Sequence, residues 1–235
     1  MDQKTPLFRL KRQARQASRA RHIPLHAALD EIAGAEGFKS WSLLAATAPR
    51  QLAASAIYTQ LKHGELLLVA ARPGHGKTLF SLELAVEATR AGHRAYFFSL
   101  EYTVCDVVQR LRTIGAEVRA LGDRFAFDDS DDISADYVIS RLAAALPGTL
   151  VVIDYLQLLD QRRDKPELAK QVSALKAFAR NKSLIIVFLS QIDRTFEASS
   201  KRVPDLEDVR LPNPLDLHLF DKTCFLNREE LLMID

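Results

Sequence analysis

The sequence predicts an α/β fold in which a mainly parallel β-sheet is covered by helices on both faces. Short apolar runs alternate with segments of helical periodicity. Most of these runs contain no polar residue, and a polar residue follows the end of several of them. Uninterrupted apolar strands separated by helices are typical of a parallel sheet that is buried on both faces. Such sheets bind ligands at the edge formed by the carboxyl ends of their strands.

The expected elements follow one another along most of the chain. Helices are expected at 79–91, 104–114, 134–146 and 167–180, where apolar residues recur at helical spacing. Strands are expected, in chain order, at 65–71, 95–100, 124–127, 149–154, 184–190 and 217–226. We therefore assign residues 49–235 to one α/β domain.

The residues before this domain have a different composition. Residues 7–21 consist mainly of good helix formers, and residues 25–35 place apolar side chains at helical spacing. A third helical turn is expected at 40–46, and the boundary is expected at 47–49, because Pro49 interrupts regular structure. We assign residues 1–48 to a basic helical N-terminal segment.

Charge is unevenly distributed along the chain, although the net charge is only +2. Residues 1–21 carry seven basic side chains and one acidic side chain, a net charge of +6, which leaves −4 on residues 22–235. A uniformly basic surface that coats nucleic acid is therefore not indicated, whereas a basic arm on a mildly acidic body is. Two interpretations of the arm stay open, a DNA contact and a solvated tail.

The composition excludes several classes of protein. Hydrophobic residues make up 48% of the 235 residues and charged residues 26%, as in ordinary globular proteins. Cys105 and Cys224 show neither metal-ligand spacing nor the density of a disulfide framework. No apolar run approaches the roughly 20 residues that span a bilayer, and no signal peptide is recognised. We expect a cytoplasmic protein without membrane association.

The strongest local signal is a glycine-rich segment, Ala71–Thr78, that ends one expected strand and begins the next helix. Its two glycines allow a tight turn whose N–H groups point at a phosphate, and the helix N-terminus adds partial positive charge. In such a loop the lysine reaches the β- and γ-phosphates of ATP and the threonine hydroxyl ligates Mg²⁺. The expected nucleotide-binding residues are Arg72, Pro73, Gly74, His75, Gly76, Lys77 and Thr78, with Thr78 also a metal ligand.

Three further polar residues end strands of the same sheet. Asp154 ends the apolar run 150–153 and is expected to hold Mg²⁺. Glu101 is a candidate general base for the attacking water, and Gln191 is a candidate sensor of the γ-phosphate. We therefore regard Lys77, Glu101 and Gln191 as the catalytic candidates. Each polar residue taken alone also fits a simple strand end, and the phosphate loop favours the functional interpretation.

A polar segment at 194–204 follows the strand that ends at Gln191. Its basic residues, Arg194, Lys201 and Arg202, can contact nucleic-acid phosphates. A solvated loop is the alternative interpretation of this cluster.

These motifs, in this order, resemble the ATPase domain of DnaB-type replicative DNA helicases. The matching strings lie at 68–78 (LVAARPGHGKT), 98–101 (FSLE), 127–130 (FDDS), 151–159 (VVIDYLQLL), 189–194 (LSQIDR) and 201–206 (KRVPDL). The resemblance covers about residues 62–228 and accounts for Ala71 at the first loop position. It implies a RecA-like P-loop NTPase that hydrolyses ATP with Mg²⁺ and moves along single-stranded DNA. It also implies a homo-oligomer, for which a hexameric ring is one form, and a replication or repair protein as partner.

The sequence departs from the family pattern at both ends. Only about 48 residues precede the core, where the family has a larger helical domain, and the chain ends at 231–235, before the family's basic finger. Fast hydrolysis is then expected to need another positively charged group at the nucleotide. The candidates are Arg202, Arg210, Arg228 or a partner protein. Residues 207–216 also replace the family's usual Arg-Glu-Ser-Gly-type run, which leaves DNA unwinding open.

Three functions fit these observations. The first is an ATPase stimulated by single-stranded DNA. The second is a nucleotide-dependent regulatory module that hydrolyses ATP slowly and modulates a replication or repair partner. The third, a small-molecule kinase, is weaker because the sequence offers no candidate lid.

Overall fold

The computed structural model describes residues 7–156, 159, 166–198, 201, 203–211, 213–227 and 230–234, without the side chains of 7–9, 46–52, 197–198 and 230. Its centre is a seven-stranded sheet in the order β3-β2-β4-β5-β1-β6-β7. All neighbouring strands run parallel except β7, which pairs antiparallel with β6. The strands are β1 Leu66–Ala71, β2 Ala95–Ser99, β3 Phe125–Asp128, β4 Leu150–Asp154, β5 Ile185–Gln191, β6 Lys222–Asn227 and β7 Glu230–Ile234. The expected α/β fold with a mainly parallel sheet is confirmed.

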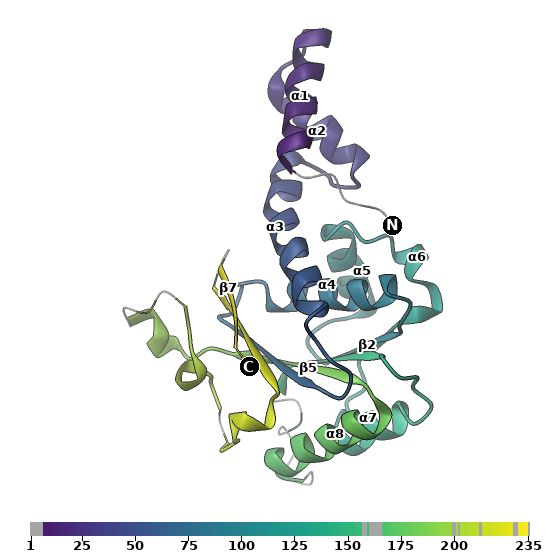
Figure 1. Ribbon diagram of the computed structural model, residues 1–235, viewed down its shortest axis with the longest axis vertical. Coiled ribbons are helices and arrows are strands. Elements are labelled where there is room, and N and C mark those ends of the chain that lie inside the picture. Colours follow the sequence, from purple (N-terminus) through teal and green to yellow (C-terminus); the bar gives the residue numbers. More distant parts are fainter. Residues whose placement is uncertain are drawn as a thin grey trace.

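Helices cover both faces of this sheet (Figure 1). They are α4 Lys77–Arg90, α5 Val104–Thr113, α6 Val118–Leu121, α7 Ala135–Arg141 and α8 Leu168–Lys182. Alternate residues of β1 divide between two cores: Leu67 and Val69 pack in the core that contains α4 and α5, and Leu66 and Leu68 pack in the core that contains α7 and α8. A strand that is buried on both faces must be apolar at every position, which is why the strand runs were recognisable in the sequence.

The last strands differ from the expectation. The expected strand at 217–226 begins only at Lys222, because Leu217–Leu219 forms a 3₁₀ turn. The Asp216 side chain caps this turn by accepting a hydrogen bond from the His218 N–H at 3.0 Å. The antiparallel strand β7 was not expected.

In the described part of the chain, three helices precede the sheet: α1 Leu7–Arg21, α2 Leu25–Ala35 and α3 Trp41–Tyr58. The first two have the expected bounds, whereas α3 is longer than the expected turn and continues through Pro49 into the body. Its end packs there, since Ala54 and Ile57 belong to the core under α4. The expected boundary at 47–49 therefore falls inside a helix, and the division into 1–48 and 49–235 stays a prediction.

The N-terminal helices have a small core of their own. Leu10, Ala33, Phe38 and Leu44 are buried together. Helices α1 and α2 lie at the end of the molecule away from the sheet (Figure 1). The Phe38 ring also covers Gly115, where a Cβ atom would lie 2.7 Å from the ring. This contact joins the helical segment to the body. No described helix is long and apolar enough to cross a membrane.

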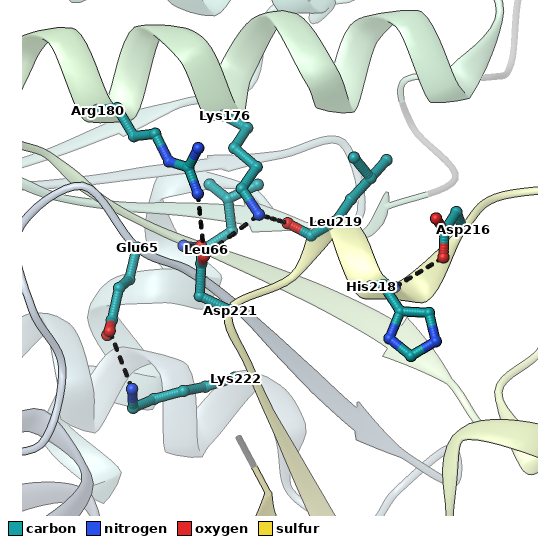
Figure 2. A network of polar contacts seen from close by, with 9 residues as sticks. All are labelled: Glu65, Leu66, Lys176, Arg180, Asp216, His218, Leu219, Asp221 and Lys222. Carbon is teal, nitrogen blue, oxygen red and sulfur yellow. Dashed lines mark hydrogen bonds and ion pairs between the residues drawn. The ribbon is translucent and has the colours of Figure 1, made fainter.

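A network of ion pairs holds the edge of the sheet where β1 and β6 begin (Figure 2). Asp221 accepts a hydrogen bond from the Leu66 N–H at 2.9 Å and pairs with Lys176 and Arg180 of α8 at 3.2 and 3.4 Å. Lys222 pairs with Glu65 at 2.9 Å. We call this edge, with these six residues, the amino edge of the sheet; its contacts hold β6 and α8 against β1.

Candidate nucleotide-binding site

The glycine-rich loop lies between β1 and α4, as the sequence predicts. Gly74 and Gly76 have φ angles of 79° and 88°, in the left-handed region that glycine adopts without strain. Gly76 occupies the N-cap of α4, and no side chain caps this helix. The first N–H groups of α4 therefore remain available to an anion, together with the positive end of the helix dipole.

The loop brings Thr78 against the end of β4. The Thr78 hydroxyl donates a hydrogen bond to Asp154 Oδ2 at 3.1 Å. Lys77 and Thr78 are largely buried, with 8% and 7% exposure. The two segments, 76 residues apart in the chain, therefore meet at the edge where the strands end, which we call the carboxyl edge.

Asp154 is a buried carboxylate with unused bonding capacity. The residue has 0% exposure, and its Oδ1 atom has no hydrogen-bond partner among the described residues. Burial raises the pKa of Asp154 to about 6; the Lys77 ammonium opposes this rise, and the negative charge of Glu101 adds to it. An unpartnered carboxylate oxygen beside a hydroxyl suits a hard cation with oxygen ligands. Asp154 and Thr78 are the residues that would hold Mg²⁺.

The acids near Asp154 would not form a metal site by themselves. Within the described part of the chain, no group of three or more His, Cys, Asp or Glu side chains is placed to hold a metal ion. Mg²⁺ commonly binds through one or two carboxylates together with substrate phosphates and water. The donors around Asp154 fit this second mode, in which the phosphates of the nucleotide complete the shell.

Glu101 and Gln191 lie on the same edge. Ser99, the last residue of β2, is in register with Asp154, and the Glu101 N–H donates to the Ser99 hydroxyl at 3.1 Å. Gln191, the last residue of β5, is in register with Ala71, where the loop begins. The structure thus brings Lys77, Thr78, Glu101, Asp154 and Gln191 to one edge of the sheet.

The segment after Gln191 is tied to the phosphate loop. The Arg72 guanidinium donates to the Asp193 carbonyl at 3.1 Å, and the Ile192 N–H donates to the Ala71 carbonyl at 3.1 Å. On its other side, the Arg210 N–H donates to the Gln191 carbonyl at 2.8 Å. The beginning of the loop therefore contacts residues 192 and 193 directly.

Two residues near the site were missed by the sequence reasoning. The Tyr102 hydroxyl lies 3.4 Å from the Thr78 hydroxyl, and the guanidinium carbon of Arg110 lies 4.2 Å from the centre of the Tyr102 ring. The positive charge of Arg110 also opposes the rise in the pKa of Asp154, with a smaller effect than that of Lys77. The available signal was their position, since Tyr102 follows Glu101 directly and Arg110 lies on the next helix.

The comparison with protein families decides the family. The model of the DnaB-like helicase C-terminal domain matches residues 53–122 and 122–233. The chain belongs to this family. The resemblance drawn from the motifs is therefore confirmed.

Curated relatives and solved structures agree with this assignment. The replicative DNA helicase DnaB of Nostoc sp. is 33% identical over 66% of this chain and 21% of that protein. DnaB of Mycoplasma genitalium is 25% identical over 71% of this chain and 43% of that protein. A solved structure of an ATPase domain has a TM-score of 0.58 and 25% identity, covering 72% of this chain and 71% of that chain. The RecA-like fold is thus confirmed, and this DnaB-like chain spans from about a fifth to under half of the curated relatives' length.

The nucleic-acid candidates of this DnaB-like domain lie after β5. Arg194 is exposed at the start of a 3₁₀ segment, Arg194–Ala198. The Lys201 ammonium pairs with Asp205 at 2.7 Å and with Asp208 at 3.2 Å, so its charge is engaged within the chain. Arg202 lies outside the described residues. Their contact with DNA stays a prediction.

Of the three arginines considered as replacements for the family's basic finger, the structure describes one. Arg210 is exposed beside the Gln191 segment, whereas Arg202 and Arg228 lie outside the described residues.

Proposed function

We propose that this DnaB-like domain binds ATP with Mg²⁺ and hydrolyses it, and that single-stranded DNA stimulates the reaction. The observation that carries the proposal is the hydrogen bond between Thr78 and Asp154, which leaves one buried carboxylate oxygen unpartnered beside the phosphate loop. A charged carboxylate without a bound cation would destabilise the fold in this position, because burial disfavours its charged form. A triphosphate with its cation offsets that cost.

The residues of the loop would act by position and charge. The N–H groups at the start of α4 and the Lys77 ammonium bind the β- and γ-phosphates, where negative charge accumulates during transfer. Thr78 and Asp154 orient the cation, and Mg²⁺, when bound, neutralises the charge that develops on the phosphate oxygens. These groups cost little reorganisation during the reaction because the fold holds them in place before ATP arrives.

The attacking water needs a proton acceptor. Glu101 lies at the same edge, and its charge is near enough to raise the pKa of Asp154. We propose that Glu101 takes the proton as water attacks the γ-phosphorus and ADP leaves. Gln191 would hydrogen-bond the γ-phosphate. When the γ-phosphate is lost, the contacts of residues 192–193 with Ala71 and Arg72 would transmit the change to the 194–204 segment.

The proposal extends to assembly and partners. The curated relatives are replicative DNA helicases, and one solved structure of 24% identity is of a DnaB-like helicase and its interactions with primase. We propose that this chain acts in DNA replication as a homo-oligomer with a replication protein as partner. Its cytoplasmic location, expected from the sequence, stays a prediction.

An ATPase assay of the wild-type chain and of Lys77→Ala, with and without single-stranded DNA, tests the proposal. We expect hydrolysis that rises with DNA in the wild type. In Lys77→Ala we expect a loss on the order of 10²–10³-fold, since one electrostatic donor is removed, with unchanged thermal unfolding. Hydrolysis retained in Lys77→Ala would contradict the site, and equal wild-type rates with and without DNA at low salt would contradict the stimulation. Mass measurement in solution tests the homo-oligomer.

A further inference from the structure

Helix α1 is fixed in place by one face. Leu10 and Ala14 on that face are buried, with 3% and 0% exposure. Arg21, on the same side of the helix, forms an ion pair with Glu31 of α2. The Ser18 hydroxyl donates to the Ile23 carbonyl at 2.7 Å. The helix is therefore anchored to α2, and its opposite face is held at a defined orientation toward solvent.

The opposite face is cationic. At 3.6 residues per turn, four basic residues fall within an arc of about 100°, whose centre lies about 130° around the helix from the buried pair. All four are exposed. We call them the α1 cationic face: Lys11, Arg12, Arg15 and Arg19.

These four charges are uncompensated within the described part of the chain. No described carboxylate pairs with any of them, whereas basic residues of the body pair with acids repeatedly, as Arg141 does with Asp128 and Lys201 with Asp205. The first turn of α1 contains no acid. Helix α1 also stands at the end of the molecule remote from the sheet (Figure 1), and residues 22–235 carry a net charge of −4. Electrostatic attraction for a polyanion is therefore concentrated on this helix.

We infer that the α1 cationic face binds the phosphate backbone of DNA, at a site separate from the nucleotide site. From residue 11 to residue 19 the helix rises about 12 Å, the length over which one strand of B-DNA, at about 3.4 Å per charge, presents three to four phosphates. Long basic side chains on a fixed helix reach phosphates without reading bases, so the site is expected to position DNA and not to select sequence.

The chemistry of the face favours DNA over a membrane. A helix that lies on a bilayer exposes an apolar face to the acyl chains. In α1 the buried apolar residues are Leu10 and Ala14, and the other apolar side chains described are two small alanines, Ala17 and Ala20. The exposed part of the helix offers basic and polar side chains and no large apolar one among the described side chains, which suits a phosphate backbone.

Fluorescence anisotropy of a labelled oligo-dT strand, titrated with the whole chain at several salt concentrations without ATP, tests this inference. The test variant replaces all four residues of the face with Gln, a good helix former that removes charge without removing the helix. We expect the salt slope of log Kobs to become shallower by about 3, since each single-strand phosphate contact contributes about 0.7. Affinity at about 50 mM salt should fall at least tenfold.

A control variant replaces four exposed basic residues of the body, Lys62, Arg94, Arg112 and Arg119, with Gln and should keep the wild-type slope. Arg21→Gln removes one charge from the buried side of α1 and should also keep it. Lys77→Ala should retain α1-dependent binding, which separates this inference from the proposed ATPase. Should the fourfold variant fail to fold, Arg12→Gln with Arg19→Gln should reduce the slope by about half as much.

Three results would overturn the inference. The first is an unchanged slope in a folded variant of the face. The second is an equal loss in the body control, which would show that total charge and not the face matters. The third is binding to phosphatidylserine vesicles but not to oligo-dT at equal ionic strength.

Discussion

Asp154 and Asp221 lie at opposite edges of the same sheet and have opposite electrostatic environments. Asp154 at the carboxyl edge is fully buried, and one of its oxygens lacks a described partner. Asp221 at the amino edge is surrounded by the Leu66 N–H, Lys176 and Arg180. Burial alone would raise the pKa of Asp221, but the Leu66 hydrogen bond and Lys176 hold it below the usual value. Burial raises the pKa of Asp154 to about 6.

The two acids thus differ in how far their charge is compensated by other groups of the chain. At the amino edge the acid has its cations within the chain, so its charge contributes to stability. At the carboxyl edge the acid has a nearby lysine and a hydroxyl, but its Oδ1 atom has no described hydrogen-bond partner. Its charge therefore opposes folding, and a bound cation would relieve this cost. The sheet thus combines a stabilised amino edge with a carboxyl edge whose buried acid costs stability, as is usual where stability is given up for function, which fits the nucleotide site that we propose there.

Glu101→Gln should have the largest effect. We expect turnover to fall by about 10²–10⁴-fold, the usual contribution of general base catalysis, while ATP binding persists. Single-turnover hydrolysis and equilibrium ATP binding measure the two quantities separately. Asp221→Asn is the matched control at the other edge and should keep the wild-type rate per folded molecule. Full turnover in Glu101→Gln would remove Glu101 from the reaction.

Asp221→Ala should destabilise the fold by about 2–4 kcal/mol, because it leaves the largely buried Lys176 without its acid and the Leu66 N–H without an acceptor. Asp221→Asn keeps an acceptor for Leu66 and should cost less. Chemical denaturation of both variants measures the free energy of unfolding. A free energy unchanged by Asp221→Ala would mean that the amino edge does not stabilise the sheet.

Asp154→Asn should stabilise the nucleotide-free protein by about 1–3 kcal/mol at pH 7, since a rise of roughly two pKa units opposes the charged form. A raised pKa means that the folded state binds the proton more tightly. The contribution of Asp154 to stability should therefore fall as the pH rises from about 4 to above 6, so the stability advantage of Asp154→Asn over the wild type should grow across this range. Asp221 acts in the reverse sense, and its contribution should disappear as the pH falls below about 4.

Denaturation of wild type and Asp154→Asn at pH 4.5 and pH 7.5, without nucleotide or Mg²⁺, checks these signs. Equal stability of the two proteins at pH 7.5 would contradict the costly charge at the carboxyl edge.

The sequence predicted the sheet and most of the candidate site because each depends on local pattern. Strands buried on both faces are apolar throughout, and the glycine spacing of the loop specifies its turn wherever strand and helix flank it. Polar residues that end parallel strands meet at one edge by topology alone, which accounts for Glu101, Asp154 and Gln191.

Features set by tertiary contact were not predictable. Helix α3 continues through Pro49 to pack Ala54 and Ile57 under α4, although proline usually ends a helix. The ring contact between Tyr102 and Arg110 has no periodic signal. The ion pair of Lys201 with Asp205 was not predicted either, since the sequence analysis took Lys201 as a candidate contact for nucleic acid.

The most direct test of the account is ATP binding with and without Mg²⁺, measured by calorimetry in the Glu101→Gln background, where hydrolysis does not consume the ligand. The account predicts that Mg²⁺ strengthens binding at least about tenfold, a gain of about 1.4 kcal/mol. It also predicts that Thr78→Val, which keeps shape but removes the hydroxyl, loses this gain. Binding that is indifferent to Mg²⁺, or a full Mg²⁺ effect in Thr78→Val, would contradict the account.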